Sequence, residues 1–306
     1  MTSVLLLWAL DLGPAGHLWG VHNLAVGDLL QLRGWRSLLA LAEGSALAAC
    51  GLVMQSLFRN PLVDASLLGV SQAAALGLAL GLVVGWPVAM QHLLAAGCAF
   101  IVLTLLMGLM RQFRYAGLGL VLLLGLALNA LLGAGLQLML AWMPASALQG
   151  VMGFLQGSFA QAGGQDVLVV WCSTLVMVLA IYHYRRQLDL MLLGSEAART
   201  AGVDSEQLQA VFILLSAVVV AILVRYAGVI GFVGMMAPAL VRWRLSGGHG
   251  VWLPWSLWVG ASMALLADIL ARTLVAPAEL PVGVVSSLLG APVFILMLFS
   301  LRWQRT

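Results

Sequence analysis

Residues 44–77, GSALAACGLVMQSLFRNPLVDASLLGVSQAAALG, decide the fold, because two apolar segments are joined here by the short polar hinge 58–64. Pro61 has no N–H to donate, and its ring disfavours helical backbone at Asn60. One helix is therefore expected to end at the hinge and another to begin. Arg59 marks the end of a segment that otherwise reads as buried in lipid. The stretch predicts two membrane-spanning helices with a tight connection between them.

The rest of the chain repeats this apolar pattern. Of its 306 residues, 63% are hydrophobic and only 8% are charged, which excludes an ordinary soluble domain. We expect a single domain over residues 1–306, all-α and polytopic, with about ten transmembrane helices, since apolar runs near the ~20 residues that span a bilayer recur throughout. The first run falls short of that length. The runs are 3–12, 37–57, 65–85, 88–110, 117–141, 167–184, 209–227, 229–243, 251–274 and 282–301.

The arginines between these runs predict the orientation of the chain. Basic residues are enriched in cytoplasmic loops, and one set of loops holds Arg59, Arg111, Arg114, Arg185, Arg186, Arg199, Arg242, Arg244, Arg302 and Arg305. The opposite set holds Arg33, Arg36, Arg225 and Arg272. The first set, and with it both termini, is therefore expected in the cytoplasm. A net charge of +3 gives no reason to expect nucleic-acid binding.

Catalytic and metal-binding patterns are missing from the sequence. Its three cysteines lie inside apolar runs, and its five histidines show no ligand spacing. The chain also lacks the phosphate-binding pattern GxxxxGK[ST] and the nucleophile pattern GxSxG. We therefore expect a protein that is not an enzyme and that binds no metal, ATP or other cofactor itself.

Two connections are long enough to carry structure of their own. The outer loop, about 142–166, has apolar spacing that indicates a short helix lying at the surface. The inner loop, about 185–208, contains LGSEAARTAGVD at 193–204. This sequence predicts a short helix opened by Ser195 as its N-cap and ended near Gly202. Taken alone, such a loop is equally consistent with a solvated connector.

Glycine and proline mark further features of the bundle. GVIGFVGMMAP at 228–238 indicates a broken or reoriented helix. In AELPVGVV at 278–285, Pro281 is expected to start the final helix, which Pro292 should kink. The spacing of Gly77, Gly81 and Gly85 predicts a close helix–helix approach.

Three polar side chains lie within predicted spans. Glu43 is a carboxylate at membrane depth, which is a functional hypothesis by default, with Arg36 as a possible partner. It is equally consistent with a paired structural acid. Asn129 and Gln137 lie in the run 117–141, where they would face a pathway or hydrogen-bond to a neighbouring helix.

The hinge, the inner loop, the broken helix and the final span together resemble the FecCD-type family, the membrane subunits of ABC importers for iron–siderophore, haem and vitamin B12. The resemblance covers about residues 30–300. It departs from the family at Gly34 and Trp35, which replace Leu-Pro, and at Ala239, which replaces a histidine whose role is therefore not carried over.

The resemblance implies a type II ABC importer permease in the bacterial inner membrane. It would move an iron chelate or a cobalamin-like cargo from periplasm to cytoplasm by alternating access. Two permease subunits, identical or different, would surround a path lined by the fifth and last spans, with Asn129 and Gln137 as candidate lining residues. Two ATPase subunits would bind ATP and Mg²⁺.

The resemblance also assigns contact residues. The ATPase would be contacted through Gly194, Glu196, Ala197, Ala198 and Arg199, and a periplasmic binding protein would dock through Arg33, Arg36 and Arg272. Arginine suits docking because its planar fork binds carboxylates bidentately. The alternatives for these arginines are interfacial anchoring and, for Arg272, a pair with Asp268 four residues earlier. The alternative function is an ion-coupled secondary transporter centred on Glu43.

Overall fold

The structure is a computed structural model that describes residues 2–13, 16–17, 26–64, 66, 69–112 and 118–303. Arg114, Arg305 and the terminal residues used to predict orientation lie outside this part. The prediction of an all-α protein is confirmed, since the strands β1 (Leu12–Gly13) and β2 (Gly16–His17) form only one short antiparallel pair. The helices are α1 (Thr2–Asp11), α2 (Val26–Phe58), α3 (Val70–Val84), α4 (Val88–Gln112), α5 (Leu118–Ala141), α6 (Ala145–Gln156), α7 (Gly164–Leu192), α8 (Ser195–Thr200), α9 (Ser205–Ala227), α10 (Val233–Arg244), α11 (His249–Thr273) and α12 (Val282–Trp303).

Six helices within the described ranges are long and apolar enough to cross a membrane, namely those that include Leu30–Phe58, Val88–Leu106, Leu123–Ala141, Gly164–Leu192, Ser205–Ala227 and His249–Thr273. Val70–Val84 and Val282–Met297 are shorter apolar helices. The number of about ten spans stays a prediction. Two predicted runs are brief in the structure: 3–12 is the ten-residue α1, and 229–243 is the twelve-residue α10.

α2 begins well before the predicted start at residue 37 and runs for 33 residues. The prediction was wrong because Arg33 and Arg36 were placed in a loop, where charged side chains usually mark the end of a span. Both arginines instead lie inside the helix and are buried. Their guanidinium groups have partners on other segments, so the helix continues through them.

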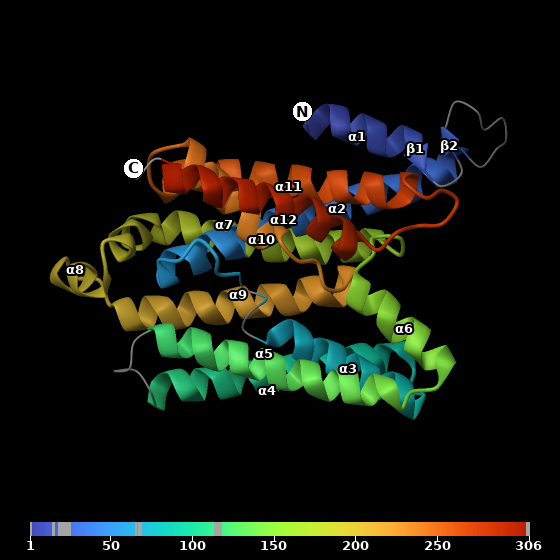
Figure 1. Ribbon diagram of the computed structural model, residues 1–306, viewed down its shortest axis with the longest axis horizontal. Helices are drawn as coiled ribbons and strands as arrows, with labels where there is room; N and C mark the ends of the chain where they lie inside the picture. Colours follow the sequence, from blue (N-terminus) through green and yellow to red (C-terminus); the bar gives the residue numbers. More distant parts are fainter. Residues whose placement is uncertain are drawn as a thin grey trace.

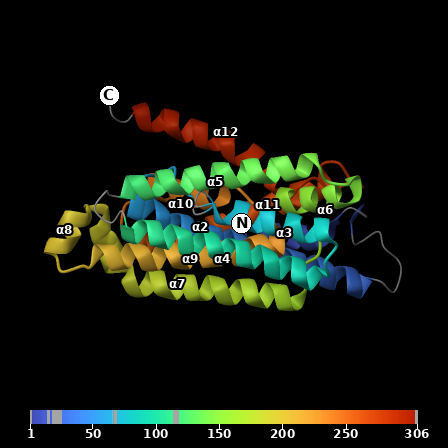
Figure 2. The same cartoon turned by 90° about the horizontal axis from the view of Figure 1, so that it is seen from below.

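α2 is the central helix of the bundle. It is buried along most of its length and packs against α11, α7, α10 and α9. α3, α4 and α5 form a second group, which meets the first mainly through contacts of α3 and α4 with α9 (Figure 1). Figure 2 shows α12 and α7 on opposite sides of the bundle. α8 lies at one end of the molecule and α6 at the other (Figures 1 and 2).

Glycines let α2 approach its neighbours without intervening side chains. A Cβ atom added to Gly44 would lie 2.2 Å from the carbonyl oxygen of Gly260 in α11, and one added to Gly51 would lie 1.7 Å from that of Gly234 in α10. Such close approach is how membrane helices gain packing energy, since lipid is as apolar as the helix surface. The predicted small-residue contact also forms between α3 and α4, where a Cβ at Gly77 would lie 2.7 Å from the Cα of Ala95.

The two predicted breaks in helical structure are confirmed. α2 ends at Phe58, Arg59 has a positive φ of 49°, and the side chain of Asn60 accepts a hydrogen bond from the N–H of Leu62 at 2.9 Å. The following helix starts at Val70, later than the expected residue 65. Residues 228–232 separate α9 from α10, and the short helix predicted in the outer loop is α6.

Gly51→Ala is expected to destabilise the protein, because the new methyl group would collide with the backbone of α10 rather than with a movable side chain. The free energy of unfolding should fall by at least the ~1–3 kcal/mol typical of overpacking. Gly97→Ala is the matched control, since an added Cβ there has no heavy atom within 4 Å. Thermal unfolding of both variants in detergent measures the difference, and equal midpoints would show that the contact between α2 and α10 is not tight.

Candidate functional site

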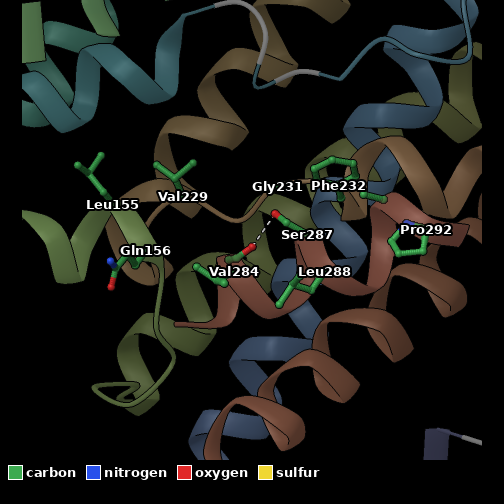
Figure 3. A pocket seen from close by; sticks show the side chains of 11 residues that line it. Leu155, Gln156, Val229, Gly231, Phe232, Val284, Ser287, Leu288 and Pro292 are labelled. Carbon is green, nitrogen blue, oxygen red and sulfur yellow. Dashed lines mark hydrogen bonds between the residues drawn. The ribbon is translucent and has the colours of Figure 1, made fainter. Parts of the chain in front are cut away.

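A cavity of about 640 Å³ lies where the end of α6, the segment 228–232 and the first half of α12 meet (Figure 3). Its size is within the range of roughly 300–1,000 Å³ typical of small-molecule sites. Most of its lining is apolar, and the polar side chains are those of Gln156 and Ser287. The apolar lining residues are Leu155, Val229, Phe232, Val284, Leu288, Ala291 and Pro292.

Backbone contacts fix the walls of this cavity. A Cβ at Gly283 would lie 2.7 Å from the carbonyl oxygen of Val229 and 2.8 Å from that of Gln156. The side chain of Ser286 donates to the carbonyl oxygen of Gly231 at 3.1 Å. α12 starts at Val282, directly after Pro281 and one residue later than expected. Small residues at the start of α12 thus let it contact the broken-helix segment directly.

Neither predicted pathway residue lines this cavity. Asn129 is half-buried on α5, and Gln137 is exposed on the same helix. The backbone of Asn129 lies beside Gly69 at the start of α3, where an added Cβ would be 3.2 Å from its nitrogen. Of the two spans expected to line a pathway, the structure places only the last one, α12, at the cavity.

The three predicted docking arginines come together at one end of the α2–α11 pair. Arg36 donates from Nε to Oδ1 of Asp268 at 2.8 Å and from Nη1 to both carboxylate oxygens of Glu279, at 2.9 and 3.0 Å. Arg272 forms the expected ion pair with Asp268, at 3.5 Å. Arg33 donates from Nη1 to the backbone oxygens of Leu10 and Asp11.

This arginine cluster (Arg33, Arg36, Arg272, Asp268 and Glu279) is largely buried. The three arginines are 6%, 7% and 1% exposed, and the side chain of Glu279 is 31% exposed. The carboxylate of Asp268 therefore lies between the guanidinium groups of Arg36 and Arg272 in a place with little water. Because α2 and α11 each contribute charged residues, the cluster fixes their relative position.

The prediction that Arg36 pairs with Glu43 is wrong, since Arg36 binds Asp268 and Glu279. Glu43 is 1% exposed, and neither of its carboxylate oxygens has a hydrogen-bond partner among the described residues. A buried polar group without a partner costs free energy. Nothing else in the described part of the structure explains why a carboxylate is buried at this position.

The predicted inner-loop helix is α8, but the prediction that Ser195 caps it is wrong. The N-cap is Gly194, whose φ of 117° favours glycine, and Ser195 is the first helical residue. α8 ends as expected beside Gly202, which has a positive φ of 82°.

Only part of the predicted ATPase-contacting set is accessible. Glu196, Ala197 and Arg199 are exposed, whereas Gly194 and Ala198 are buried. Arg199 pairs with Glu206 in the first turn of α9 and donates to the hydroxyl of Ser205 at 3.2 Å. α8 is therefore a small, internally braced protrusion at its end of the molecule (Figure 1).

A chain of buried polar groups near α8 was missed by the sequence reasoning. Oδ1 of Asp189, in the last turn of α7, lies 2.8 Å from the backbone nitrogen and 2.6 Å from Nδ1 of His249. Nε2 of His249 is 2.8 Å from the hydroxyl of Ser56, to which Arg242 donates at 2.8 Å. A signal was available: Asp189 follows the predicted span 167–184, and His249 precedes the predicted span 251–274, on the same predicted side of the membrane.

No group of three or more His, Cys, Asp or Glu side chains in the described ranges is arranged to hold a metal ion. The polar chain near α8 combines one carboxylate, one imidazole, one hydroxyl and one guanidinium. These groups are bound to one another rather than directed into the cavity.

Comparison with known proteins gives a consistent result. The model of the FecCD transport family matches residues 16–300. The hemin transport system permease HmuU of Yersinia pestis is 38% identical over 286 residues, covering 90% of this chain and 84% of the relative. The vitamin B12 import permease BtuC of Escherichia coli is 36% identical over 310 residues, covering 97% of this chain and 93% of that protein.

Solved structures show the same fold. A putative metal-chelate type ABC transporter, described in an inward-facing conformation, superimposes with a TM-score of 0.88 at 29% identity over 97% of this chain and 96% of its own. PsaBC from Streptococcus pneumoniae superimposes with a TM-score of 0.58 at 15% identity, which supports the fold alone.

Arg36→Met is expected to destabilise the protein strongly, because it leaves Asp268 buried with only the longer pair to Arg272. Breaking a buried ion pair from one side typically costs about 3–5 kcal/mol. Glu279→Gln should cost only about 0–1 kcal/mol, since that side chain is partly exposed. Arg244→Met, at an exposed arginine, is the control in thermal unfolding. If Arg36→Met and Arg244→Met unfolded alike, the cluster would not stabilise the fold.

Proposed function

The chain belongs to the FecCD transport family, and from this premise we propose that it forms half of the membrane pathway of an ATP-driven importer for a metal chelate of the haem or cobalamin kind. The observation that carries the proposal is the match of nearly the whole chain to importer permeases, over nine-tenths or more of its length. The chain is a multi-pass membrane protein that functions in transport and is not itself an enzyme.

The cavity supports a bulky, largely apolar cargo. Its walls offer apolar side chains and few polar groups, so they suit a flat macrocycle better than a small hydrophilic ion. HmuU is named for hemin and BtuC for vitamin B12, and we propose a cargo of that class here. Selection among such cargoes would rest largely with the binding protein.

A second permease subunit would complete the pathway. Outward-facing apolar residues of α12 support this part of the proposal, since Leu288 and Leu296 are 69% and 68% exposed. Leu288 also lines the cavity. A subunit placed against this side of α12 would close the cavity and turn it into a path between two chains. Identical and different second subunits both fit this arrangement.

Two ATPase subunits, which bind ATP and Mg²⁺, would contact the α8 end. α8 is suited to this because a short braced helix transmits a push better than an open loop. Its accessible side chains are those of Glu196, Ala197 and Arg199, while Gly194 and Ala198 would support it from within. The α8 end and both termini would face the cytoplasm, in agreement with the exposed arginines Arg59 and Arg199.

A periplasmic binding protein would dock at the opposite end, over the arginine cluster. Arg33, Arg36 and Arg272 are the proposed contacts, and Glu279 covers Arg36 from the solvent side. A carboxylate of the binding protein would reach Arg36 by displacing Glu279. In this view, Glu279 holds the position of the partner's acidic residue until docking.

The ion-coupled alternative has less support. It requires an essential carboxylate exchanging ions, yet Glu43 is buried away from the cavity and does not line it. The chain's own family, in contrast, contains the permeases named above.

Reconstitution tests the function. Proteoliposomes holding the chain with its ATPase and binding protein should take up haem, cobalamin or a ferric siderophore when ATP is supplied. Ala197→Trp should abolish uptake and ATPase copurification, because a large side chain would obstruct the contact surface of α8. Ala160→Trp, at an exposed alanine beyond the other end of α7, should do neither. Uptake driven by an ion gradient without ATP would contradict the proposal.

Docking has its own test. Glu279→Gln should raise the affinity of the permease complex for its binding protein, because it removes the negative charge that competes for Arg36. Affinity is measured with the complex in nanodiscs against the immobilised binding protein. Glu206→Gln, at the α8 end, should leave affinity unchanged. Equal affinities of wild type and Glu279→Gln would show that docking does not use Arg36.

A further inference from the structure

The polar chain near α8 is continuous from Asp189 to Arg242. Nδ1 of His249 faces the carboxylate of Asp189 at 2.6 Å, which requires a proton on Nδ1. Nε2 lies 2.8 Å from the hydroxyl of Ser56, whose single hydrogen also has the carbonyl oxygen of Leu52 as an acceptor at 2.7 Å. Ser56 in turn accepts from Arg242. Each group therefore contacts the next, from the guanidinium to the carboxylate, and hydrogen bonds in such chains polarise one another.

The side chains of this chain are bonded mainly to one another, although Nε of Arg242 is buried without a partner among the described residues. The other nearby acceptor, the carbonyl oxygen of Leu52, also receives a hydrogen bond from Arg242, at 2.7 Å. His249 is fully buried, whereas the side chain of Asp189 is 39% exposed. The chain thus runs from the surface beside the α7–α8 connection into the interior.

The four residues lie on four different helices. Asp189 is on α7, His249 on α11, Ser56 on α2 and Arg242 on α10. Oδ1 of Asp189 also accepts from the backbone N–H of His249 and so caps the start of α11. A displacement of the end of α7 must therefore move α11 and, through Ser56, the end of α10.

α10 connects this chain to the cavity. Arg242 is in the last turn of α10, and Phe232, its N-cap residue, lines the cavity together with Gly231. Twelve residues of helix span about 18 Å. The side chain of Gln55 binds the carbonyl oxygen of Met235 at 2.7 Å, and Gly51 meets Gly234 directly. α10, which contains Pro238, is therefore held against α2 at its start by these contacts and at its end by Arg242.

We propose that Asp189, His249, Ser56 and Arg242 are positioning residues that transmit movement of the α7–α9 connection to the cavity wall at Gly231 and Phe232. This inference rests on the proposed function, in which the ATPase moves α8. It adds the route by which that movement reaches the cargo site. The route avoids α3, α4 and α5 and uses the core helices α2, α10 and α11.

A cysteine reporter at the cavity tests the route. Leu288→Cys replaces a cavity-lining residue of α12, which faces the proposed path in the complete importer, in a background where the three native cysteines are changed to alanine. In the complete importer complex, the rate of maleimide labelling is compared without nucleotide and with ATP and vanadate. ATPase activity and thermal unfolding are measured on the same samples.

We expect nucleotide to change the labelling rate several-fold in the parent, and this dependence to be lost in Ser56→Ala and Asp189→Ala while ATP hydrolysis continues. Asp189→Asn should restore it, because the amide oxygen still accepts from His249. Ser262→Ala is the matched control, since Ser262 is a buried serine of α11 that binds only the carbonyl oxygen of Trp258 at 2.8 Å.

Three results would overturn the inference. Nucleotide dependence retained in both Ser56→Ala and Asp189→Ala would show that movement takes another route. The same loss in Ser262→Ala, or a loss that accompanies unfolding, would assign the residues a purely structural role. If the labelling rate of the parent complex were the same with and without nucleotide, the proposed coupling itself would be overturned, and the route with it.

Discussion

The direct contact of α2 with α10 and α11 is the constraint on which the other features depend. Where Gly44 meets Gly260 and Gly51 meets Gly234, backbone lies on backbone, with no side chain between. This holds the start of α10 close against α2, and the segment before it, 228–232, lies against α12. The cavity follows from that arrangement, because its walls are the broken-helix segment and the helix that packs on it.

Polar contacts join α2 to α11 near both ends of α2. Toward the start of α2, Arg36 binds Asp268 of α11, and toward its end, Ser56 meets His249 of α11. Between them the glycines allow close contact but specify little about sliding along the helix axis. In an apolar medium, directional polar contacts are a means of fixing register, and here they do so at two points far apart. The two polar ends and the apolar middle together define one position of α11 on α2.

The features that could be predicted from the sequence are those set by local backbone chemistry. Pro61 and the glycines at 228 and 231 lie where helices end, and the apolar runs predict membrane helices. Partners distant in the sequence could not be predicted, since Glu279 lies 243 residues from Arg36. The sequence also does not show which face of each helix packs on protein and which faces lipid. Lipid and protein core are both apolar, so the sequence has little hydrophobic periodicity. The cap at Gly194 was missed because a positive φ there outweighed the serine beside it.

The connection that carries α8 joins two different parts of the bundle, which fits the coupling role proposed for this short helix. α7, before it, packs on α2 and α11, whereas α9, after it, packs on α3 and α4 as well as on α2. A push on α8 therefore acts on the core helices through α7 and on the second group through α9. Alternating access needs two bodies that move relative to each other around a fixed site. The chain places its α8 protrusion where the helices leading to both bodies meet.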